Sequence, residues 1–365
     1  MAVEKIDIEE FLKQSHQFPV IDVRSPGEFK HAHIPNAYSF PLFTDEERKI
    51  VGTTYKQQSR EDAIKIGLEF FGIKMRKMVE EVENLVTSYE LQIPGDDNSE
   101  TRNSKPKIRN TILVHCWRGG MRSAAVAWLL DLYGFKVYTL AGGYKTFRNW
   151  VLKQFEKNYH FTILGGYTGS GKTIVLHKLK ELGKKIIDLE AIANHKGSAF
   201  GALGENPQPS QEMFENLFAL KLVDEGYGVG EDLEGAWLED ESQRIGKCMI
   251  PNNIWSQMRI SKIYFLDIPF EERLKYLVEG YGKFDTEQLT DSIIRIERRL
   301  GGLETKNAIN FLLENNVNEC FSILLKYYDK LYTKGLHNRK NYESLLNIIP
   351  CSNVNAYDNV NNLLR

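Results

Sequence analysis

A cysteine in the first half of the chain stands in a loop suited to nucleophilic chemistry. In the segment HCWRGGMRS (115–123), Cys116 is followed by two arginines and two glycines: Arg118, Gly119, Gly120 and Arg122. The glycines allow backbone N–H groups to curl around an anion, and the arginines add positive charge. Because such a site favours the thiolate, we expect Cys116 to have a lowered pKa and to be a catalytic nucleophile. A cysteine that only fills a core would be followed by apolar residues.

Two classes of enzyme use a loop of this kind. The string His-Cys-x-x-Gly-x-x-Arg-Ser spells the signature of cysteine phosphatases, and the loop length alone favours that class. The flanking sequence favours sulfur or selenium transfer, because VIDVRSPGEFKHAHIPNAYSFPL (20–42) and LAGGY (140–144) resemble segments of the rhodanese family in the correct order. A phosphatase would also need an aspartate as general acid near Cys116, and the sequence does not identify one.

A second motif predicts a binding site for phosphates. GYTGSGKT (166–173) fits the pattern G-x-x-x-x-G-K-[ST] completely, after an apolar strand and before a helix. We expect Lys172 to contact terminal phosphates and Thr173 to hold Mg²⁺. The expected diphosphate-binding residues are Gly166, Gly169, Ser170, Gly171, Lys172 and Thr173. The motif indicates polyphosphate binding and leaves the reaction open.

The acidic partner of such a motif is less sharply defined. Asp240, in LEDE (238–241) at the end of a predicted strand, is the first candidate for Mg²⁺, and Asp188 is the second. Both carboxylates have an ordinary alternative as helix caps or surface groups. Arg273 is either a phosphate contact or a solvated helix residue.

The elements that must position these residues alternate between short apolar strands and amphipathic helices. This alternation predicts an α/β protein with parallel sheets and crossover helices. The rhodanese resemblance and the P-loop motif then imply a rhodanese-like N-terminal parallel-sheet domain and a P-loop NTPase-like C-terminal α/β domain. From Pro269 onward the pattern is mostly helical. The predicted strands are FPVIDV (18–23), TILVHC (111–116), KVYTL (136–140), HFTILGG (160–166), KKIIDLE (184–190), EGAWLED (234–240) and KIYFLDI (262–268).

The domain boundaries follow from this pattern. We expect a first domain over 1–145, with a flexible polar surface loop at 94–110 and a long helical stretch at 64–90. A linking helix at 146–159 would lead to the P-loop domain at 160–350. Residues 351–365, which are rich in Asn, would form a loosely held tail.

Composition excludes several classes of protein. Among 365 residues the hydrophobic fraction is 42%, the charged fraction is 26% and the net charge is -2, as in ordinary globular proteins. The four cysteines form no C-x-x-C pair, which favours a reducing compartment. No signal peptide and no apolar run of about 20 residues is present, so we expect a cytoplasmic protein with no membrane partner. We expect a monomer without a tightly bound cofactor.

The combination of the two motifs resembles one family, the tRNA 2-selenouridine synthase family. The resemblance extends from about Ile21 to about Glu272, and the segments outside the motifs carry it as much as the motifs do. Those segments are YKQQSREDAIKIGLEF (55–70), AGGYKTFRNWV (141–151), IDLEAIANHKGSAFG (187–201), PQPSQEMFENL (207–217) and EDESQRIGKCMIP (239–251).

The resemblance implies a substrate and two co-substrates. The family acts on a wobble uridine of tRNA that already carries a 2-thio group. It attaches a geranyl group from geranyl diphosphate to that sulfur, and then replaces the geranylthio group by selenium from selenophosphate. The cysteine proposed as the family's selenium carrier corresponds to Cys116, and its P-loop lysine corresponds to Lys172.

A tRNA substrate requires basic side chains near the sites. The first candidates are Lys145, Arg148 and Lys153 on the predicted linking helix, although each has the ordinary alternative of a solvated side chain. Tyr144 and Phe147 would either stack on an unpaired base or pack at the domain junction. Further basic candidates are Lys157, Lys178, Lys180, Lys184 and Lys185.

Overall fold

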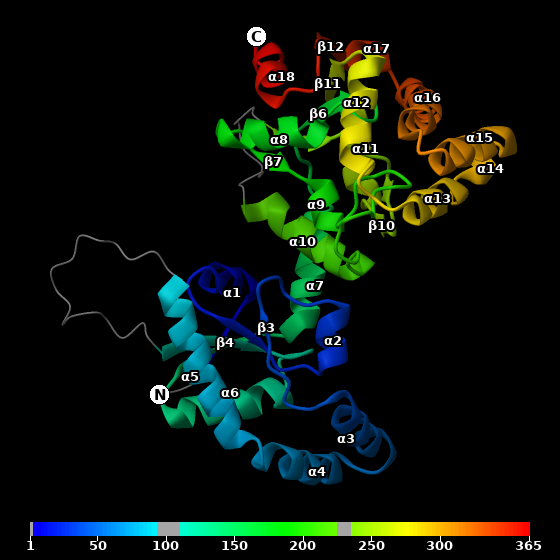
Figure 1. Ribbon diagram of the computed structural model, residues 1–365. Helices are drawn as coiled ribbons and strands as arrows, with labels where there is room; N and C mark the ends of the chain where they lie inside the picture. The colour runs from blue at the N-terminus through cyan, green and yellow to red at the C-terminus, as the bar shows by residue number, and fades with distance from the viewer. Residues whose placement is uncertain (1–2, 93–109, 225–234) are drawn as a thin grey trace. The chain divides into compact units, whose positions relative to one another are not determined.

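The computed structural model describes residues 3–92, 110–224 and 235–365 (Figure 1). The chain divides into two compact units, Met1–Lys153 and Gln154–Arg365. Each unit contains a five-stranded sheet whose paired strands are parallel. The predicted α/β class with a helical C-terminal region is therefore confirmed.

The first unit is built on the strand order β1-β5-β4-β2-β3. The central strand β4 is buried along its whole length, as expected for an apolar run covered on both faces. Side chains alternate along it, so that Ile112, Val114 and Cys116 join one hydrophobic cluster. The strands are β1 (Glu4–Ile6), β2 (Val20–Asp22), β3 (Tyr38–Ser39), β4 (Thr111–His115) and β5 (Lys136–Leu140).

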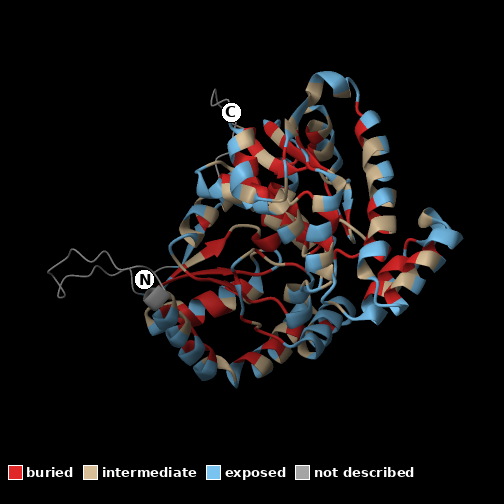
Figure 2. Cartoon of the chain, turned by 45° about the horizontal axis from the view of Figure 1, so that its top comes forward, coloured by how far each residue is buried: buried red, intermediate tan, exposed pale blue. Residues whose placement is uncertain are grey.

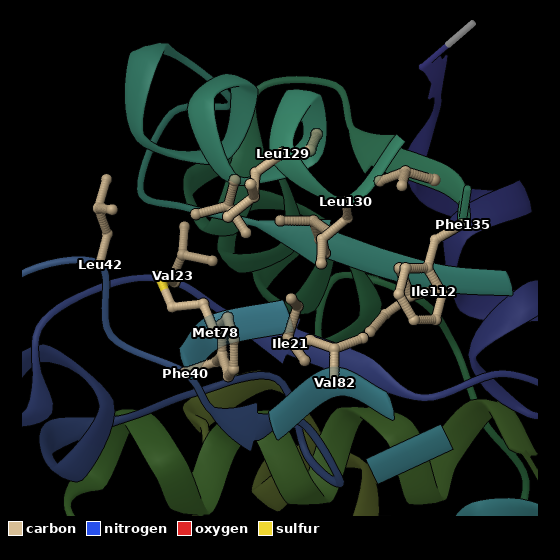
Figure 3. Close-up of a cluster of buried hydrophobic side chains, with 14 of the residues drawn as sticks. Ile21, Val23, Phe40, Leu42, Met78, Val82, Ile112, Leu129, Leu130 and Phe135 are labelled. Carbon is tan, nitrogen blue, oxygen red and sulfur yellow. The ribbon is translucent and has the colours of Figure 1, made fainter. Parts of the chain in front are cut away.

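Helices cover both faces of this sheet. In Figure 3, Leu130 of α6 (Met121–Tyr133) and Val82 of α5 (Met75–Gln92) approach Ile21 and Ile112 of the strands. On the other face, His115 lies between rings from two further helices. Its centroid is 6.2 Å from that of Phe11 on α1 (Ile8–Ser15) and 6.4 Å from that of Tyr144 on α7 (Gly143–Gln154).

The helical stretch predicted at 64–90 consists of two helices. The first, α4 (Arg60–Gly72), ends at a C-cap at Ile73, and α5 begins at Met75. Two more helices precede them, α2 (Pro26–His31) and α3 (Asp45–Gln57), and α3 packs on α4. Apart from Asn110, the loop predicted at 94–110 lies outside the described residues.

The second unit has the strand order β12-β11-β6-β8-β7. The strands are β6 (Phe161–Gly166), β7 (Ile186–Ile187), β8 (Ala236–Glu239), β11 (Lys262–Asp267) and β12 (Leu346–Pro350). A small antiparallel pair, β9 (Arg244–Ile245) and β10 (Cys248–Met249), stands apart from this sheet. Strand β12 lies in the C-terminal region, where the sequence pattern predicts mostly helix.

Helices surround the second sheet and extend beyond it. In both units the central strands β4 and β6 are buried, whereas the edge strands β3 and β12 are more exposed, and the helices turn exposed residues outward (Figure 2). The helices α12 to α16 contribute to a separate hydrophobic cluster that includes Leu277, Ile293, Leu312 and Phe321. The helices are α8 (Lys172–Glu181), α9 (Leu189–Ala193), α10 (Gln211–Asp224), α11 (Asn252–Ile260), α12 (Phe270–Tyr281), α13 (Thr286–Ile294), α14 (Glu297–Leu300), α15 (Gly302–Leu313), α16 (Val317–His337) and α17 (Tyr342–Leu345).

The end of the chain is ordered, and the prediction of a loosely held tail at 351–365 is wrong. Residues Ala356–Leu363 form α18, which contacts α8. Val360 and Leu363 are buried in the same cluster as Leu176 of α8. The Asn-rich composition concealed this helix, because its apolar residues lie on a single face.

The predicted linking helix is displaced from its expected position. It begins at Gly143 rather than at 146 and ends at Gln154, so almost all of it belongs to the first unit. Tyr144 and Phe147 are fully buried in that unit. They are therefore unable to stack on an RNA base, and the packing alternative holds. No helix in the described ranges combines the length and apolar character that crossing a bilayer requires.

Candidate functional site

Cys116 lies directly after β4, in the loop that leads into α6. The start of α7 fixes this loop: the N–H of Tyr144 donates to the carbonyl of Cys116 (2.8 Å), and the N–H of Lys145 donates to that of Trp117 (3.0 Å). Gly143 has a φ of 61°, and a Cβ there would collide with the Cys116 carbonyl oxygen. The LAGGY segment therefore closes the cysteine loop.

The thiol is stabilised as a thiolate. Its Sγ lies 3.2 Å from the hydroxyl of Ser123. Burial, the largest single effect, would raise the pKa of Cys116, but hydrogen bonds from the Ser123 hydroxyl and from the N–H groups of Ser123 and Arg118, with the charge of Arg122, lower it. The direction of this shift is the one expected from the loop sequence.

The two loop arginines have different surroundings. Arg122 is held by Glu28, with N–O distances of 2.8 and 3.4 Å, and Glu28 also contacts Arg48 at 2.7 Å. Burial would raise the pKa of Glu28, but the hydrogen bond and charge of Arg122, with smaller contributions from Arg48 and the Ser25 N–H, lower it to about 2. Arg118 contributes its backbone N–H to Cys116, and its side chain is exposed.

A buried ion pair between Arg24 and Asp22 packs against Tyr144, the residue whose N–H holds the cysteine loop. Arg24 donates to the carboxylate of Asp22 at 2.6 Å and stacks over the ring of Tyr144. His115 lies 3.7 Å from Asp22, and its burial lowers the histidine pKa. No role for Glu28 or Ser123 was predicted from the sequence. Glu28 lies in the rhodanese-like segment 20–42, and Ser123 is the last residue of the HCxxGxxRS signature, which was the available signal for it.

The P-loop connects β6 to α8 in the geometry expected of such a motif. Positive φ angles occur at Gly166, Gly169 and Gly171, which only glycine adopts easily. The ammonium group of Lys172 donates to the carbonyl of Gly166 at 3.2 Å. Ser170 is buried, and its hydroxyl has no hydrogen-bond partner among the described residues.

Three glutamates converge on the P-loop threonine. Glu190, Glu239 and Glu241 each offer one carboxylate oxygen, and these oxygens lie within 4.8 Å of one another. The hydroxyl of Thr173 donates to Glu190 at 3.2 Å. Glu239 is fully buried, and neither of its carboxylate oxygens has a hydrogen-bond partner among the described residues. We call these three residues the glutamate cluster.

The electrostatics of the glutamate cluster favour a cation. Burial, followed by repulsion between the carboxylates, raises the pKa of each glutamate to about 8, while the charge of Lys172 acts in the opposite direction. Hard oxygen ligands beside a P-loop threonine suit Mg²⁺. The residues present therefore fit this ion, and its ligands would come from the glutamate cluster and Thr173.

The structure contradicts the assignment of Asp240 as the Mg²⁺ ligand. The carboxylate of Asp240 accepts a hydrogen bond from the hydroxyl of Tyr332 at 2.6 Å and forms a salt bridge with buried Arg339. Successive side chains after a strand point to opposite sides, so the neighbours Glu239 and Glu241 face the P-loop instead. Asp188 caps α9, as the ordinary alternative states.

Arg273 is a structural residue rather than a phosphate contact. It is buried, and its guanidinium group forms two hydrogen bonds with the carboxylate of Asp329, at 2.9 and 2.8 Å. It also donates to the carbonyl of Thr168 in the P-loop at 3.1 Å. Arg273 therefore attaches α16 to the P-loop.

Three segments of the resemblance in the second unit contact one another, and two of them contain the residues of the glutamate cluster. Gly197 lies so close to the carboxylate of Glu241 that a Cβ would be 2.5 Å from one of its oxygens. Gln208 donates to the carbonyls of Ala193 and Ile245, at 3.0 and 3.1 Å. These contacts give a packing reason for the sequences IDLEAIANHKGSAFG, PQPSQ and EDESQRIGKC.

The first three basic candidates for tRNA contact lie along α7. Lys145 and Lys153 are exposed, and Arg148 is partly exposed. Lys145 directly follows the residue whose N–H binds the Cys116 carbonyl, so this helix begins at the cysteine loop.

The fold and the two sites define a class of protein that joins a rhodanese-like unit to a P-loop unit. The family model of the rhodanese-like domain matches residues 7–149, and the model of the tRNA 2-selenouridine synthase AAA domain matches residues 159–285. A tRNA 2-selenouridine synthase from Sulfurovum sp. is 31% identical over 86% of this chain and 87% of its own length. The chain belongs to the tRNA 2-selenouridine synthase family.

Two further proteins are similar to this chain. A tRNA 2-selenouridine synthase from Aeromonas salmonicida is 31% identical over 88% of each chain. Among solved structures, the N-terminal domain of a Clostridium difficile 630 protein described as ATP/GTP-binding is 35% identical. It covers 41% of this chain and 99% of its own, with a TM-score of 0.32.

Proposed function

We propose that this chain is a transferase that replaces the 2-thio sulfur of a wobble uridine in tRNA by selenium. Family membership and the names of the relatives support tRNA as the substrate and selenouridine as the product. The proposed co-substrates are geranyl diphosphate and selenophosphate, and the proposed intermediate is the S-geranylated base.

The P-loop unit suits the geranylation step. In this step the 2-thio sulfur forms a bond to C1 of the geranyl group, the C–O bond breaks, and diphosphate leaves. The amides of the P-loop and Lys172 would bind the diphosphate, and Thr173 with the glutamate cluster would hold Mg²⁺. A divalent cation held there would supply charge neutralisation for the departing diphosphate.

The cysteine loop suits the selenium step. Selenophosphate is a small anion that the backbone amides of the loop, Arg118 and Arg122 would bind, and Cys116 would activate it as a nucleophile. A selenium nucleophile then attacks C2 of the base, a C–Se bond forms, the C–S bond breaks, and geranylthiol leaves. Geranylation makes this exchange easier, because it converts the sulfur into a better leaving group.

The observation that carries the proposal is the presence of both sites in one chain. A thiol with a lowered pKa stands in an anion-binding loop, and a P-loop with a glutamate cluster follows it. A cysteine phosphatase fused to a P-loop module is the alternative enzyme. Family membership counts against this alternative, as does the engagement of Glu28 and Asp22 with arginines.

Mass spectrometry of nucleosides tests the proposal. Thiolated tRNA is incubated with the protein, geranyl diphosphate and selenophosphate, and is then digested. We expect geranylated 2-thiouridine when selenophosphate is omitted and 2-selenouridine in the complete reaction. If the base is unchanged in both mixtures, the proposal is wrong.

A further inference from the structure

The loop around Cys116 offers more contacts than a single selenium atom requires. We propose that the Cys116 thiolate attacks the phosphorus atom of selenophosphate, so that the cysteine accepts a phosphoryl group and hydroselenide is released. The S–P bond forms as the P–Se bond breaks, and selenium is never bonded to the cysteine. This inference rests on the proposed function, because it takes selenophosphate as the donor.

Attack of the thiolate on phosphorus and attack on selenium give different products, because the P–Se electron pair goes to a different atom in each. When the thiolate attacks phosphorus, the P–Se electron pair leaves with selenium, and the hydroselenide formed is the nucleophile needed at C2. Water then attacks phosphorus, the thiolate is regenerated, and phosphate leaves. If the thiolate instead attacked selenium, the P–Se pair would remain on phosphorus and phosphite would leave. The phosphoryl route needs no oxidant or reductant.

The shape of the loop fits a tetrahedral phosphoryl group. Five residues separate Cys116 from Arg122, and within the described part of the chain the N–H groups of residues 117–122 donate to no backbone carbonyl. A Cβ on Gly120 would meet nothing within 4 Å, so this side of the loop is open. Three phosphoryl oxygens can accept hydrogen bonds from several of these N–H groups at once.

Arg122 is oriented for the same group. Glu28 holds its guanidinium through two contacts, which fixes the plane of the planar donor set. Its charge reaches Cys116 and helps to stabilise the thiolate. A guanidinium held in this way can form two parallel hydrogen bonds with phosphoryl oxygens, as arginine does in other phosphate sites.

The surrounding carboxylates favour selenide as the leaving group. Two described carboxylates contact residues of the HCWRGGMRS segment: Glu28 binds Arg122, and Asp22 lies beside His115 and binds Arg24. Both carboxyl pKa values are lowered despite burial: by Arg122 at Glu28, and by His115 followed by Arg24 at Asp22. Neither group therefore holds a proton at neutral pH. An alkoxide leaving group needs such a proton. Hydroselenide is a weak base and leaves without one, which favours selenophosphate over a phosphate ester.

Ser123 has a role in the second half of this cycle. Its hydroxyl lies 3.2 Å from Sγ and 3.1 Å from the Gly120 carbonyl oxygen. When the thiolate is present, the single hydroxyl hydrogen can turn to Sγ and stabilise it, both before attack and when water displaces it from phosphorus. Ser123→Ala should therefore slow the breakdown of phosphocysteine and allow the adduct to accumulate. This variant keeps Cys116, so the adduct can be detected directly.

The test uses the full-length protein with selenophosphate and no tRNA. Phosphorus NMR should show orthophosphate formed faster than by Cys116→Ser, and mass spectrometry of Ser123→Ala should show a phosphate adduct on the Cys116 peptide. Cys248→Ser, which alters another buried thiol, should match the wild type. Formation of phosphite, or a selenium adduct on the Cys116 peptide, would overturn the inference.

A probe without selenium separates this inference from the proposed function. 4-Nitrophenyl phosphate has a good leaving group, and Cys116-dependent release of nitrophenolate would support phosphoryl transfer. If selenouridine forms while selenophosphate yields phosphite, the inference fails and the proposed function stands. If the phosphate adduct forms but tRNA is never selenated, the proposed function fails and the phosphoryl chemistry stands.

Discussion

The hydroxyl of Thr173 donates a hydrogen bond of 3.2 Å to the carboxylate of Glu190, and so joins the P-loop to the glutamate cluster. We predict that Glu239→Gln weakens the stabilisation of the protein by Mg²⁺ with inorganic diphosphate. Glutamine resembles the protonated acid but lacks the charge that a cation requires, so the fold without Mg²⁺ should be retained. Thermal melting with and without Mg²⁺ measures the effect.

A matched variant shows whether the loss of any one negative charge would change the response to Mg²⁺. Glu181→Gln removes an exposed carboxylate of α8 and should leave the Mg²⁺ response unchanged. Asp240→Asn should instead lower the melting temperature, because breaking a buried ion pair with Arg339 costs roughly 3–5 kcal/mol. A normal Mg²⁺ response in Glu239→Gln would show that the cation binds elsewhere.

The contrast between Asp240 and its neighbours shows what sequence can and cannot predict here. The segment LEDE places acids at the end of a strand beside the P-loop, and the alternation of side chains puts Glu239 and Glu241 on one side and Asp240 on the other. The sequence does not say which side faces Thr173. That depends on Arg339, about a hundred residues further along the chain, which binds Asp240.

The cysteine loop was more predictable. The strand, the loop and the helix that position Cys116 are contiguous in sequence, and their apolar and glycine patterns indicate this arrangement directly. The role of Glu28 was not predictable in this way, because its partner Arg122 lies 94 positions away. Local motifs can therefore be predicted from the sequence. The ion pairs between distant residues that orient these motifs depend on the tertiary fold.

Cys116→Ser should abolish selenium incorporation while leaving the fold intact. Serine is nearly the same size as cysteine, but its hydroxyl is a far weaker nucleophile at neutral pH. If geranylation precedes selenation, geranylated tRNA should accumulate in this variant. Nucleoside mass spectrometry measures both products. A Cys116→Ser protein that still forms selenouridine would remove Cys116 from the mechanism.

Ser123→Ala should raise the pKa of Cys116. Ser123 hydrogen bonds stabilise the thiolate, and losing the hydroxyl removes the largest effect that opposes burial. The pKa of Cys116 is lowered in the wild type, so its thiolate persists to lower pH than in the variant. The alkylation rates of the two proteins should therefore differ most below the pKa of the variant and become equal above it. The rate of alkylation by iodoacetamide against pH measures this difference. Overlapping profiles would argue against a role for the hydroxyl.

Lys172→Ala should weaken the binding of geranyl diphosphate. The loss of one charge-assisted contact costs about 1.5–3 kcal/mol, which corresponds to roughly 10- to 150-fold in affinity. Lys180→Ala, an exposed lysine on the same helix, is the control. Isothermal titration with geranyl diphosphate compares the three proteins. Unchanged affinity together with unchanged geranyl transfer would show that the P-loop binds another ligand.

Binding of tRNA should fall steeply with salt, although the net charge of the chain is -2. A protein that neutralises Z phosphates shows a log–log slope of about -0.7Z to -0.9Z. Combined substitution of Lys145, Arg148 and Lys153 by alanine should weaken binding and flatten the slope, because these side chains lie along α7, which begins at the cysteine loop. Affinity measured over a series of salt concentrations gives the slope.

The control for this experiment removes the same charges from another surface. Lys49, Lys56 and Arg60 are exposed on α3 and α4, and their combined substitution by alanine should leave the salt slope close to that of the wild type. Release of phosphate from selenophosphate without tRNA should be unchanged in the α7 variant, because its three side chains lie outside the 115–123 segment. If the α7 variant and the wild type have identical slopes, tRNA binds elsewhere. The helical region beyond Pro269 is then the next surface to test, starting with the exposed Lys326, Lys330 and Lys334 along α16.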